Sequence, residues 1–256
     1  SAITLIGLSE TVNTVCLYFF QELLPKFPDI QGFSYNGFWA HSWACAVAAR
    51  RLGHPSLGFD TIPGDLYLAG MLQGIGRLMF AVHFPVEFNK CVEKAKELNC
   101  AVIQCEKDLF GTTDNLVGAR ILEVWNMPDN ICRAVAFSHM PHLAAPEFMT
   151  CAALIQFAYA VAANCRIGDH GDGIVPALAN TYLGEKTGSK LSEPDVQNKL
   201  IEELSSTLKA KAGSMFPGLK TDKRKPEANA KRLHSTGRGQ IGRNSEKENG
   251  IRPEKS

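Results

Sequence analysis

Residues 68–80 read LAGMLQGIGRLMF, an apolar helical stretch with a polar interruption, Gln73-Gly74, at its centre. A glycine in the interior of a helix costs about 1 kcal/mol relative to alanine, so its presence here needs a reason. The apolar residues on both sides predict a helix that packs in the core. What Gln73 and Gly74 replace therefore bears on both the fold and the function.

The stretch 85–99 continues the helical pattern, because its apolar residues recur three or four positions apart. Pro85 suits the first turn of a helix, and Asn99 suits its end. The residues on the apolar face are Phe88, Cys91, Val92, Ala95 and Leu98.

Three more helices are expected in the second half of the chain. One covers 113–125 after a Thr-Asp cap, and another covers 147–164, which is apolar nearly all round and should therefore be central. The last runs from Ser192, which with Asp195 resembles a capping box, to Gly213. Alternating strand patterns are essentially missing, so we expect an all-α fold.

The charge is distributed unevenly along the 256 residues. Residues 220–256 carry 11 Lys and Arg against 5 Asp and Glu, whereas the rest of the chain carries 16 against 21. We expect one helical domain over 1–213 and a basic, disordered tail over 214–256, because the tail has too few apolar residues to form a core. The acidic body is unsuited to nucleic acid, and only the tail leaves that function open.

The cysteines and the apolar runs indicate the compartment. Eight cysteines are scattered without any C-x-x-C pair, as expected of small buried side chains in a reducing environment. No signal peptide is recognisable, and no apolar run approaches the length that spans a bilayer. The sequence therefore predicts a cytoplasmic protein that does not contact a membrane.

The frame around Gln73 resembles a helix of the HD superfamily of metal-dependent phosphohydrolases, whose defining His-Asp pair would occupy Gln73 and Gly74. Further motifs narrow the resemblance to the HD-related output domain (HDOD) of bacterial signalling proteins, and they stand in the order of that family. This resemblance implies an HD-domain-like helical bundle. The motifs are AITLIGL at 2–8, FWAHSWACAVAARRL at 38–52, LFGTTDNLVGARILEVWNMP at 109–128 and AVAFSHMPH at 134–142.

Most metal-ligand positions implied by the resemblance hold other residues. Asp114 replaces a histidine, Ser138 replaces the first residue of a later His pair, and Tyr159 lies near the position of a late aspartate. Loss of even one supporting residue commonly lowers metal affinity or activity 10–100-fold, so several ligand losses should abolish binding. We therefore expect no metal, no other cofactor and no catalysis. The candidates for a relict binding pocket are His41, Gln73, Gly74, Asp114, Ser138 and His139.

Several of these residues have a plainer interpretation beside the functional one. His41 is a relict ligand or pocket residue, or a core imidazole bonded to backbone, and Gln73 is a pocket amide or simply fills the former metal cavity. His139 and His142 have a spacing compatible with a metal but lack carboxylate support. The GDHGDG run at 168–173 suggests cation binding, but a flexible turn is expected because the calcium-loop spacing is absent.

The resemblance implies a non-catalytic output or scaffold module that binds a protein partner, or a nucleotide or other small ligand, through the relict pocket. A surviving phosphohydrolase acting on a nucleotide such as a cyclic dinucleotide is the competing enzyme hypothesis, and nucleic-acid binding through the basic tail is a third. Members of the family commonly begin with a further helical segment before the motif at 2–8. This chain starts almost on that motif, so we expect it to be either a fragment of a longer protein or a shortened version of the family without those N-terminal helices.

Overall fold

The computed structural model describes residues 8–28, 30, 32–186, 188–217 and 219, and structural statements below refer to these residues. They contain no strand and only one isolated bridge, between Ile30 and Phe33, which confirms the all-α prediction. The motif at 2–8, apart from Leu8, and residues 220–256 of the predicted tail lie outside the described residues. The helices are α2 (Leu8–Leu23), α3 (Tyr35–Leu52), α4 (Pro63–Leu72), α5 (Ile75–His83), α6 (Pro85–Glu97), α7 (Val102–Phe110), α8 (Asp114–Val124), α9 (Asp129–Ala136), α10 (Pro146–Cys165), α11 (Tyr182–Glu185) and α12 (Pro194–Met215).

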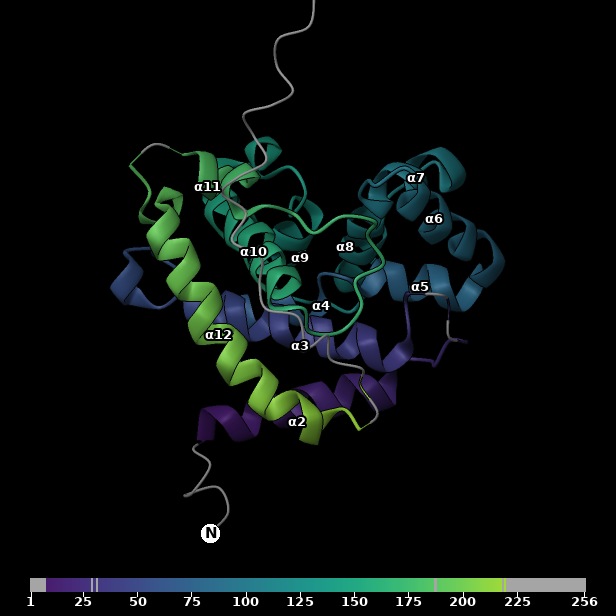
Figure 1. Cartoon of the computed structure of the whole chain (residues 1–256), viewed down its shortest axis with the longest axis horizontal. Helices are drawn as coiled ribbons and strands as arrows, with labels where there is room; N and C mark the ends of the chain where they lie inside the picture. Colours follow the sequence, from purple (N-terminus) through teal and green to yellow (C-terminus); the bar gives the residue numbers. More distant parts are fainter. Residues whose placement is uncertain (1–7, 29, 31, 187, 218, 220–256) are drawn as a thin grey trace, which may run out of the picture. The chain divides into compact units, whose positions relative to one another are not determined.

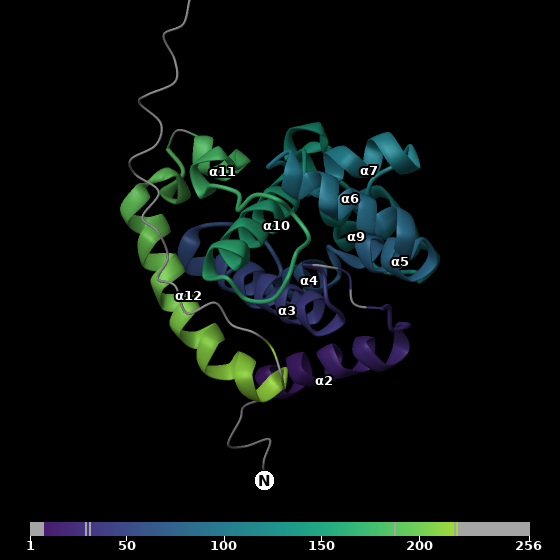
Figure 2. The same cartoon turned by 45° about the vertical axis from the view of Figure 1, so that its right-hand side comes forward.

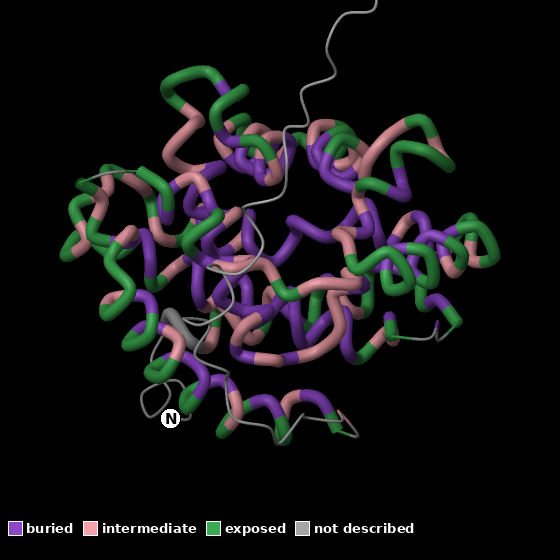
Figure 3. Tube along the Cα trace, turned by 45° about the horizontal axis from the view of Figure 1, so that its top comes forward, coloured by how far each residue is buried: buried purple, intermediate pink, exposed green. Residues whose placement is uncertain are grey.

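Helix α10 is the central element of the fold, as its all-round apolarity predicts. It contacts α3, α4, α9 and α12, and the two views show it between α12 on one side and α5 to α8 on the other (Figures 1 and 2). Contrary to the expectation that no run could span a bilayer, its 20 residues are long and apolar enough to do so. Its burial against the other helices accounts for that composition and is consistent with a soluble protein (Figure 3).

The stretch 68–80 forms two helices rather than one, which corrects the expectation of a continuous core helix. Helix α4 ends at Leu72 and α5 begins at Ile75, so Gln73 and Gly74 form the junction. The backbone carbonyl of Gly74 accepts the N–H of Arg77 at 3.0 Å, which opens α5. A glycine at a helix start avoids most of the cost of one in a helix interior.

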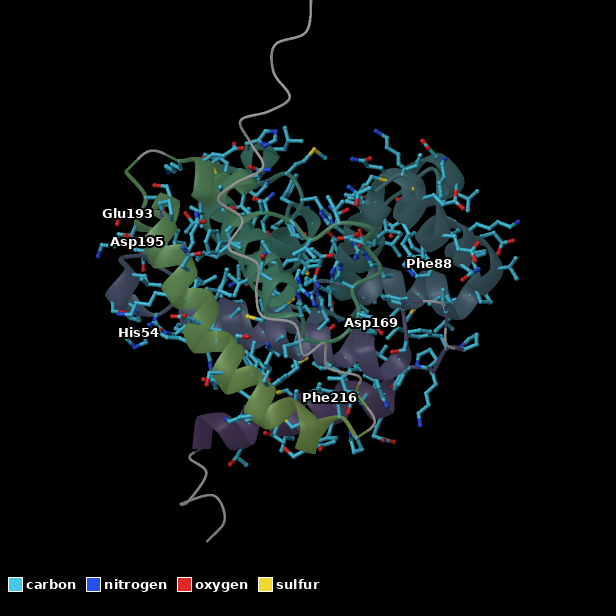
Figure 4. All side chains as sticks on the ribbon, in the orientation of Figure 1. His54, Phe88, Asp169, Glu193, Asp195 and Phe216 are labelled. Carbon is cyan, nitrogen blue, oxygen red and sulfur yellow. The ribbon has the colours of Figure 1, made fainter. Side chains whose placement is uncertain are left out.

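The predicted ends of the last helix differ from those observed. Helix α12 begins at Pro194 without a side-chain cap, because the Ser192 hydroxyl donates instead to the carbonyl of Ser189 at 2.7 Å. The helix continues past Gly213 to Met215. Phe216 then packs on Trp43, with ring centroids 5.9 Å apart, so the folded part reaches beyond residue 213 (Figure 4). The other expected helices, at 85–99, 113–125 and 147–164, are confirmed within one or two residues.

Candidate functional site

The structure brings most of the predicted site residues into one buried cluster. His41, in the middle of α3, places its Nε2 atom 3.3 Å from Cys45 Sγ and its ring 5.0 Å from the ring of Tyr159 on α10. The side-chain amide of Gln73 lies 3.9 Å from the same sulfur, so Cys45 links Gln73 to His41. His41, Gln73 and Tyr159 stand at or near positions where the superfamily has two histidines and an aspartate, and these three residues thus lie next to one another in space.

A residue that the sequence analysis did not single out, Arg77 on α5, occupies the centre of this cluster. Its guanidinium is almost fully buried and lies one helical turn beyond Gln73. Nε is 2.9 Å from Asp114 Oδ2 and 3.7 Å from Glu106 Oε1, and Nη1 donates to the Tyr159 hydroxyl at 3.1 Å. One cation therefore contacts α7, α8 and α10 together.

The loop that follows α10 completes the cluster. Nη1 of Arg77 lies 3.5 Å from Asp172 Oδ1 and also donates to the backbone carbonyl of His170. The Tyr159 hydroxyl donates to Asp172 Oδ2, and the backbone N–H of Val102 donates to Asp172 Oδ1 at 2.8 Å. The carboxylate of Asp172 does pair with a cation, as the GDHGDG run suggested, but that cation is the side chain of Arg77.

The same loop is packed against α3 rather than standing free as the expected turn. The backbone N–H of Asp169 donates to the carbonyl of Gly37 at 2.9 Å, and the hydroxyl of Ser34 donates to the Asp169 carboxylate at 2.9 Å (Figure 4). Gly168 has a positive φ of 70°, and a Cβ there would lie 2.1 Å from the Gly37 carbonyl oxygen. Only glycine permits this close approach.

Asp114 owes its position to an equally close contact between α5 and α8. Asp114 is the first residue of α8, and a Cβ at Gly76 would lie 1.9 Å from its carbonyl oxygen. The absence of a side chain at Gly76 thus lets α8 approach α5 until the Asp114 carboxylate reaches Arg77. Glu106 Oε2 accepts the backbone N–H of Asp114 at 2.8 Å and fixes the start of the helix.

Burial and neighbouring charge act in opposite directions on the carboxylates. Burial disfavours ionisation of Asp114, but Arg77 and then His139 outweigh it and lower the pKa of Asp114 to about 2. The pKa of Asp172 is likewise held well below its usual range, because Arg77 and His170 outweigh its burial. Burial and the nearby Asp114 charge instead raise the pKa of Glu106 well above its usual range. The buried cation thus favours the ionised form of Asp114 and Asp172, whereas burial and the Asp114 charge disfavour ionisation of Glu106.

His41 and Tyr159, on the inner side of the site, are uncharged. Burial, followed by the charges of His170 and Arg77, lowers the pKa of His41 well below its usual range. Burial raises the pKa of Tyr159 well above its usual range, so its phenol keeps the proton that it donates to Asp172. His139 lies at the outer edge, with Nε2 3.3 Å from Asp114 Oδ1 and its side chain 22% exposed.

Two of the six predicted residues and one neighbouring histidine lie outside the charge network. Gly74 has no side chain, and a Cβ there would meet the Phe38 ring at 3.0 Å. The buried hydroxyl of Ser138 donates to the carbonyl of Val135 at 2.9 Å. His142 is exposed. The structure therefore unites His41, Gln73, Asp114 and His139 by contact and leaves these three apart.

The residues of the site do not fit a metal ion. Among the described residues, no group of three or more His, Cys, Asp or Glu side chains is arranged to hold one. Gly74 supplies no donor atom, and the tyrosine near the position of the late aspartate keeps its proton. The guanidinium of Arg77 already neutralises Asp114 and Asp172, and a divalent ion beside it would meet a like charge.

The sequence contained weak signals for the residues that were missed. Arg77 is the one charged residue in the apolar run 68–80, and a lone charge in a core helix needs a buried partner. Asp172 lies in the GDHGDG run, which suggested a cation without showing which one. Glu106 stands three residues before the motif at 109–128, but nothing in that motif shows that its carboxyl group meets Asp114. Nothing in the local pattern shows that α5, α8 and the loop meet.

Comparisons with known proteins agree with this architecture. The HDOD domain family matches residues 1–141. A solved HDOD domain protein of unknown function from Geobacter sulfurreducens superposes with a TM-score of 0.62 at 22% identity, covering 80% of this chain and 69% of that one. A putative signal transduction protein from Marinobacter aquaeolei gives 0.61 at 23% identity, covering 79% of this chain and 44% of that one.

Two further relatives carry other descriptions. A putative phosphohydrolase from Shewanella amazonensis superposes with a TM-score of 0.58 at 18% identity, covering 84% of this chain and 73% of that one. An uncharacterized protein of Treponema pallidum is 27% identical over 106 residues, which is 39% of this chain and 20% of the length of that relative. With the family match extending over more than half of its length, this chain belongs to the HDOD domain family.

Proposed function

We propose that this domain is a non-catalytic output or scaffold module of signal transduction, which acts by binding a protein partner. The observation that carries the proposal is the Arg77 guanidinium, which lies among the residues that stand for metal ligands and neutralises the carboxylates there. A hydrolytic centre of the HD type needs donor atoms for a metal and a water on that metal. The Marinobacter relative, described as a putative signal transduction protein, supports the signalling role.

The competing function is hydrolysis of a phosphoester, which the description of the Shewanella relative suggests. Metal content and activity, measured on the full chain, separate the two functions. The purified protein, incubated with Mn²⁺, Fe²⁺ or Zn²⁺ and desalted, should retain well under one ion per chain. It should release no phosphate or linear dinucleotide from a cyclic dinucleotide with or without added metal. A stoichiometric ion together with hydrolysis that chelation abolishes would refute the non-catalytic assignment.

The burial of the relict pocket affects how a partner could bind. His41, Gln73, Asp114 and Ser138 are buried, and of the six predicted residues only His139 combines partial exposure with a place in the network. A protein on the surface would therefore reach the rim at His139 and not the interior. His170, in the same loop as Asp172, lies with its ring 5.2 Å from that of His41, so a nucleotide that reached His41 past this residue would have to displace the loop.

The described surface offers a protein partner an apolar stripe on α2. Helix α2 packs its other face inward, with Phe20 stacked on Trp125 at 6.5 Å between ring centroids, and leaves a row of large apolar side chains between 48% and 61% exposed. A shallow hollow of about 430 Å³ lies along this row and includes Val15 and Phe19. Continuous apolar surface of this kind marks protein interaction sites in many soluble proteins. The exposed apolar residues are Val12, Val15, Tyr18, Phe19 and Leu23.

Affinity capture from the native cell tests the binding function with a matched pair of variants. Phe19→Glu places a charge in the stripe, and Leu98→Glu places the same charge at an equally exposed apolar residue at the end of α6. The unaltered chain and Leu98→Glu should capture the same protein, and Phe19→Glu should lose it. Capture that is unchanged in Phe19→Glu would exclude the α2 stripe. A chain that enriches no protein but gains thermal stability with a nucleotide would favour a small ligand.

A further inference from the structure

We propose that the side chain of Arg77 is an internal cation that takes the structural place of the metal ion and clamps loop 168–173 onto the helices of the site. The misfit between the residues present and a metal ion leads to this inference. Where the resemblance implies metal ligands, hydrogen-bond acceptors from three separate parts of the chain instead surround the guanidinium of Arg77.

The contacts of Arg77 are distributed as those of a bridging cation would be. On one side Nε faces the carboxylates of Asp114 and Glu106, at 2.9 and 3.7 Å. On the other side Nη1 contacts the Tyr159 hydroxyl at 3.1 Å, the Asp172 carboxylate at 3.5 Å and the carbonyl of His170. A planar guanidinium with five N–H groups can serve several acceptors at fixed angles, which the single ammonium of a lysine cannot reproduce.

The composition of the loop makes the clamp necessary. Residues 168–173 read GDHGDG and contain no apolar side chain that could anchor them in the core. Three glycines in six residues also increase the conformational freedom that is lost when the loop is ordered. The loop nevertheless lies against the helices, held by backbone bonds from Asp169 to Gly37 at 2.9 Å and from Gly173 to Cys100 at 3.0 Å. Between these two bonds, the polar groups of His170 and Asp172 meet Arg77.

Charge explains why a cation is required at this point. Asp172 is buried, and a buried carboxylate without a partner is strongly unfavourable. Its Oδ1 atom accepts the Val102 N–H, but a hydrogen bond alone does not neutralise it. In the absence of the guanidinium the loop would relieve the cost by moving Asp172 into water. Arg77 thus links the closed position of the loop to the packing of α5.

The first experiment measures loop opening directly by amide hydrogen exchange in the full chain. Arg77→Ala removes the cation, and Arg120→Ala removes an exposed arginine that pairs with Glu123 at 2.9 Å on the surface of α8. Amides of 168–173 should exchange at least about 10-fold faster in Arg77→Ala than in the unaltered chain, since opening no longer breaks the ion pairs. Arg120→Ala should leave them unchanged. Unchanged exchange in Arg77→Ala would overturn the clamp.

A second variant covers the case in which Arg77→Ala does not fold. Asp172→Asn keeps the shape of the side chain and leaves Arg77 paired with Asp114, so the helices retain their ion pair. Exchange should then accelerate in 168–173 and stay unchanged in the amides of α8. Equal exchange in the loop of Asp172→Asn and of the unaltered chain would contradict the clamp independently of Arg77→Ala.

Chemical rescue tests whether the missing group is a cation. Arg77→Ala leaves a buried space beside Asp114 and Asp172, which free guanidinium at low millimolar concentration can fill. Guanidinium at ten times its Kd should raise the Tm of Arg77→Ala by about 3 to 6 °C and restore slow loop exchange. The unaltered chain and Arg120→Ala should show no rise. Equal rescue by neutral urea would show that volume matters and charge does not, and would overturn the proposal.

The clamp is a property of the interior and partner binding is a property of the surface, so each can fail without the other. Loss of partner capture in Phe19→Glu with unchanged loop exchange concerns the α2 stripe alone. Rescue of Arg77→Ala by Zn²⁺ to one ion per chain, with no rescue by guanidinium, would show that the site prefers a metal once the arginine is removed. That result would refute the internal-cation role.

Discussion

Asp114 offers the sharpest test of the buried ion pair, and Asp114→Asn is the smallest change that removes it. The amide keeps the size of the carboxylate and still accepts a hydrogen bond, but it cannot neutralise Arg77, which lies 2.9 Å away. Arg77 would retain Asp172 as its ionised partner. The expected effect is therefore the loss of one charge from the network without a cavity.

The magnitude follows from the pKa of Asp114. A folded-state pKa of about 2, against about 3.9 for an unperturbed aspartate, means that ionised Asp114 stabilises the fold by about 2 to 3 kcal/mol at neutral pH. Because the folded pKa is depressed, this stability is present above about pH 4 and is lost as the pH falls toward 2. At pH 7 the variant should unfold about 4 to 12 °C below the unaltered chain.

The assay is urea unfolding followed by circular dichroism at pH 7 and at successively lower pH. The difference in the free energy of unfolding between the two proteins should be largest at pH 7 and shrink below pH 4. Asp108→Asn is the matched control, because Asp108 pairs with Lys94 at 3.3 Å but both side chains are largely exposed. It should cause no measurable change. A variant at Asp114 as stable as the control at pH 7 would refute the reasoning that Arg77 depends on this carboxylate.

Three further perturbations test other parts of the site. Glu106→Gln should match the unaltered chain near pH 5 and become more stable than it as the pH rises toward 8, because the pKa of Glu106 is raised in the folded state and its ionisation therefore destabilises the fold. Urea unfolding at the two pH values measures this difference, and an advantage of the variant that falls with rising pH would contradict it. Gly76→Ala should destabilise the fold by about 1 to 3 kcal/mol or more, since its Cβ would lie 1.9 Å from the Asp114 carbonyl oxygen. Gly213→Ala, in α12, has open space around the new Cβ and should stabilise the fold by up to about 1 kcal/mol. Calorimetry that ranks the two variants the other way would exclude the close-contact explanation. Dialysis against EDTA should leave the Tm of the unaltered chain unchanged, and a fall of several degrees that added metal reverses would mean that the fold depends on a bound ion.

The helical architecture could be predicted because it depends on local pattern. The apolar face at 85–99 and the uniform apolarity of 147–164 each indicate a helix and its depth without knowledge of any neighbour. The ends were less accurate where a local bond competed. Ser192 bonds to Ser189 rather than capping α12, and Gly213 does not end the helix because Phe216 is held by the core.

The site could be predicted only in part, because its decisive contacts join residues far apart in the sequence. The resemblance to the HD superfamily pointed to Asp114 and His139, and these do lie in contact. It did not identify Arg77, whose importance depends on meeting Asp172, almost a hundred positions later. The interpretation of residues 168–173 as a flexible turn followed from their composition, which takes no account of a buried cation supplied from another helix.

The guanidinium on α5 differs from a bound ion in one further respect. A metal centre is occupied only while the free ion is abundant enough to fill it, so its occupancy follows the concentration of that ion in the cell. Arg77 is joined to the backbone by covalent bonds and is present at every dilution. In the proposed clamp the central charge therefore does not depend on the supply of iron or any other ion, and no chelating competitor can remove it.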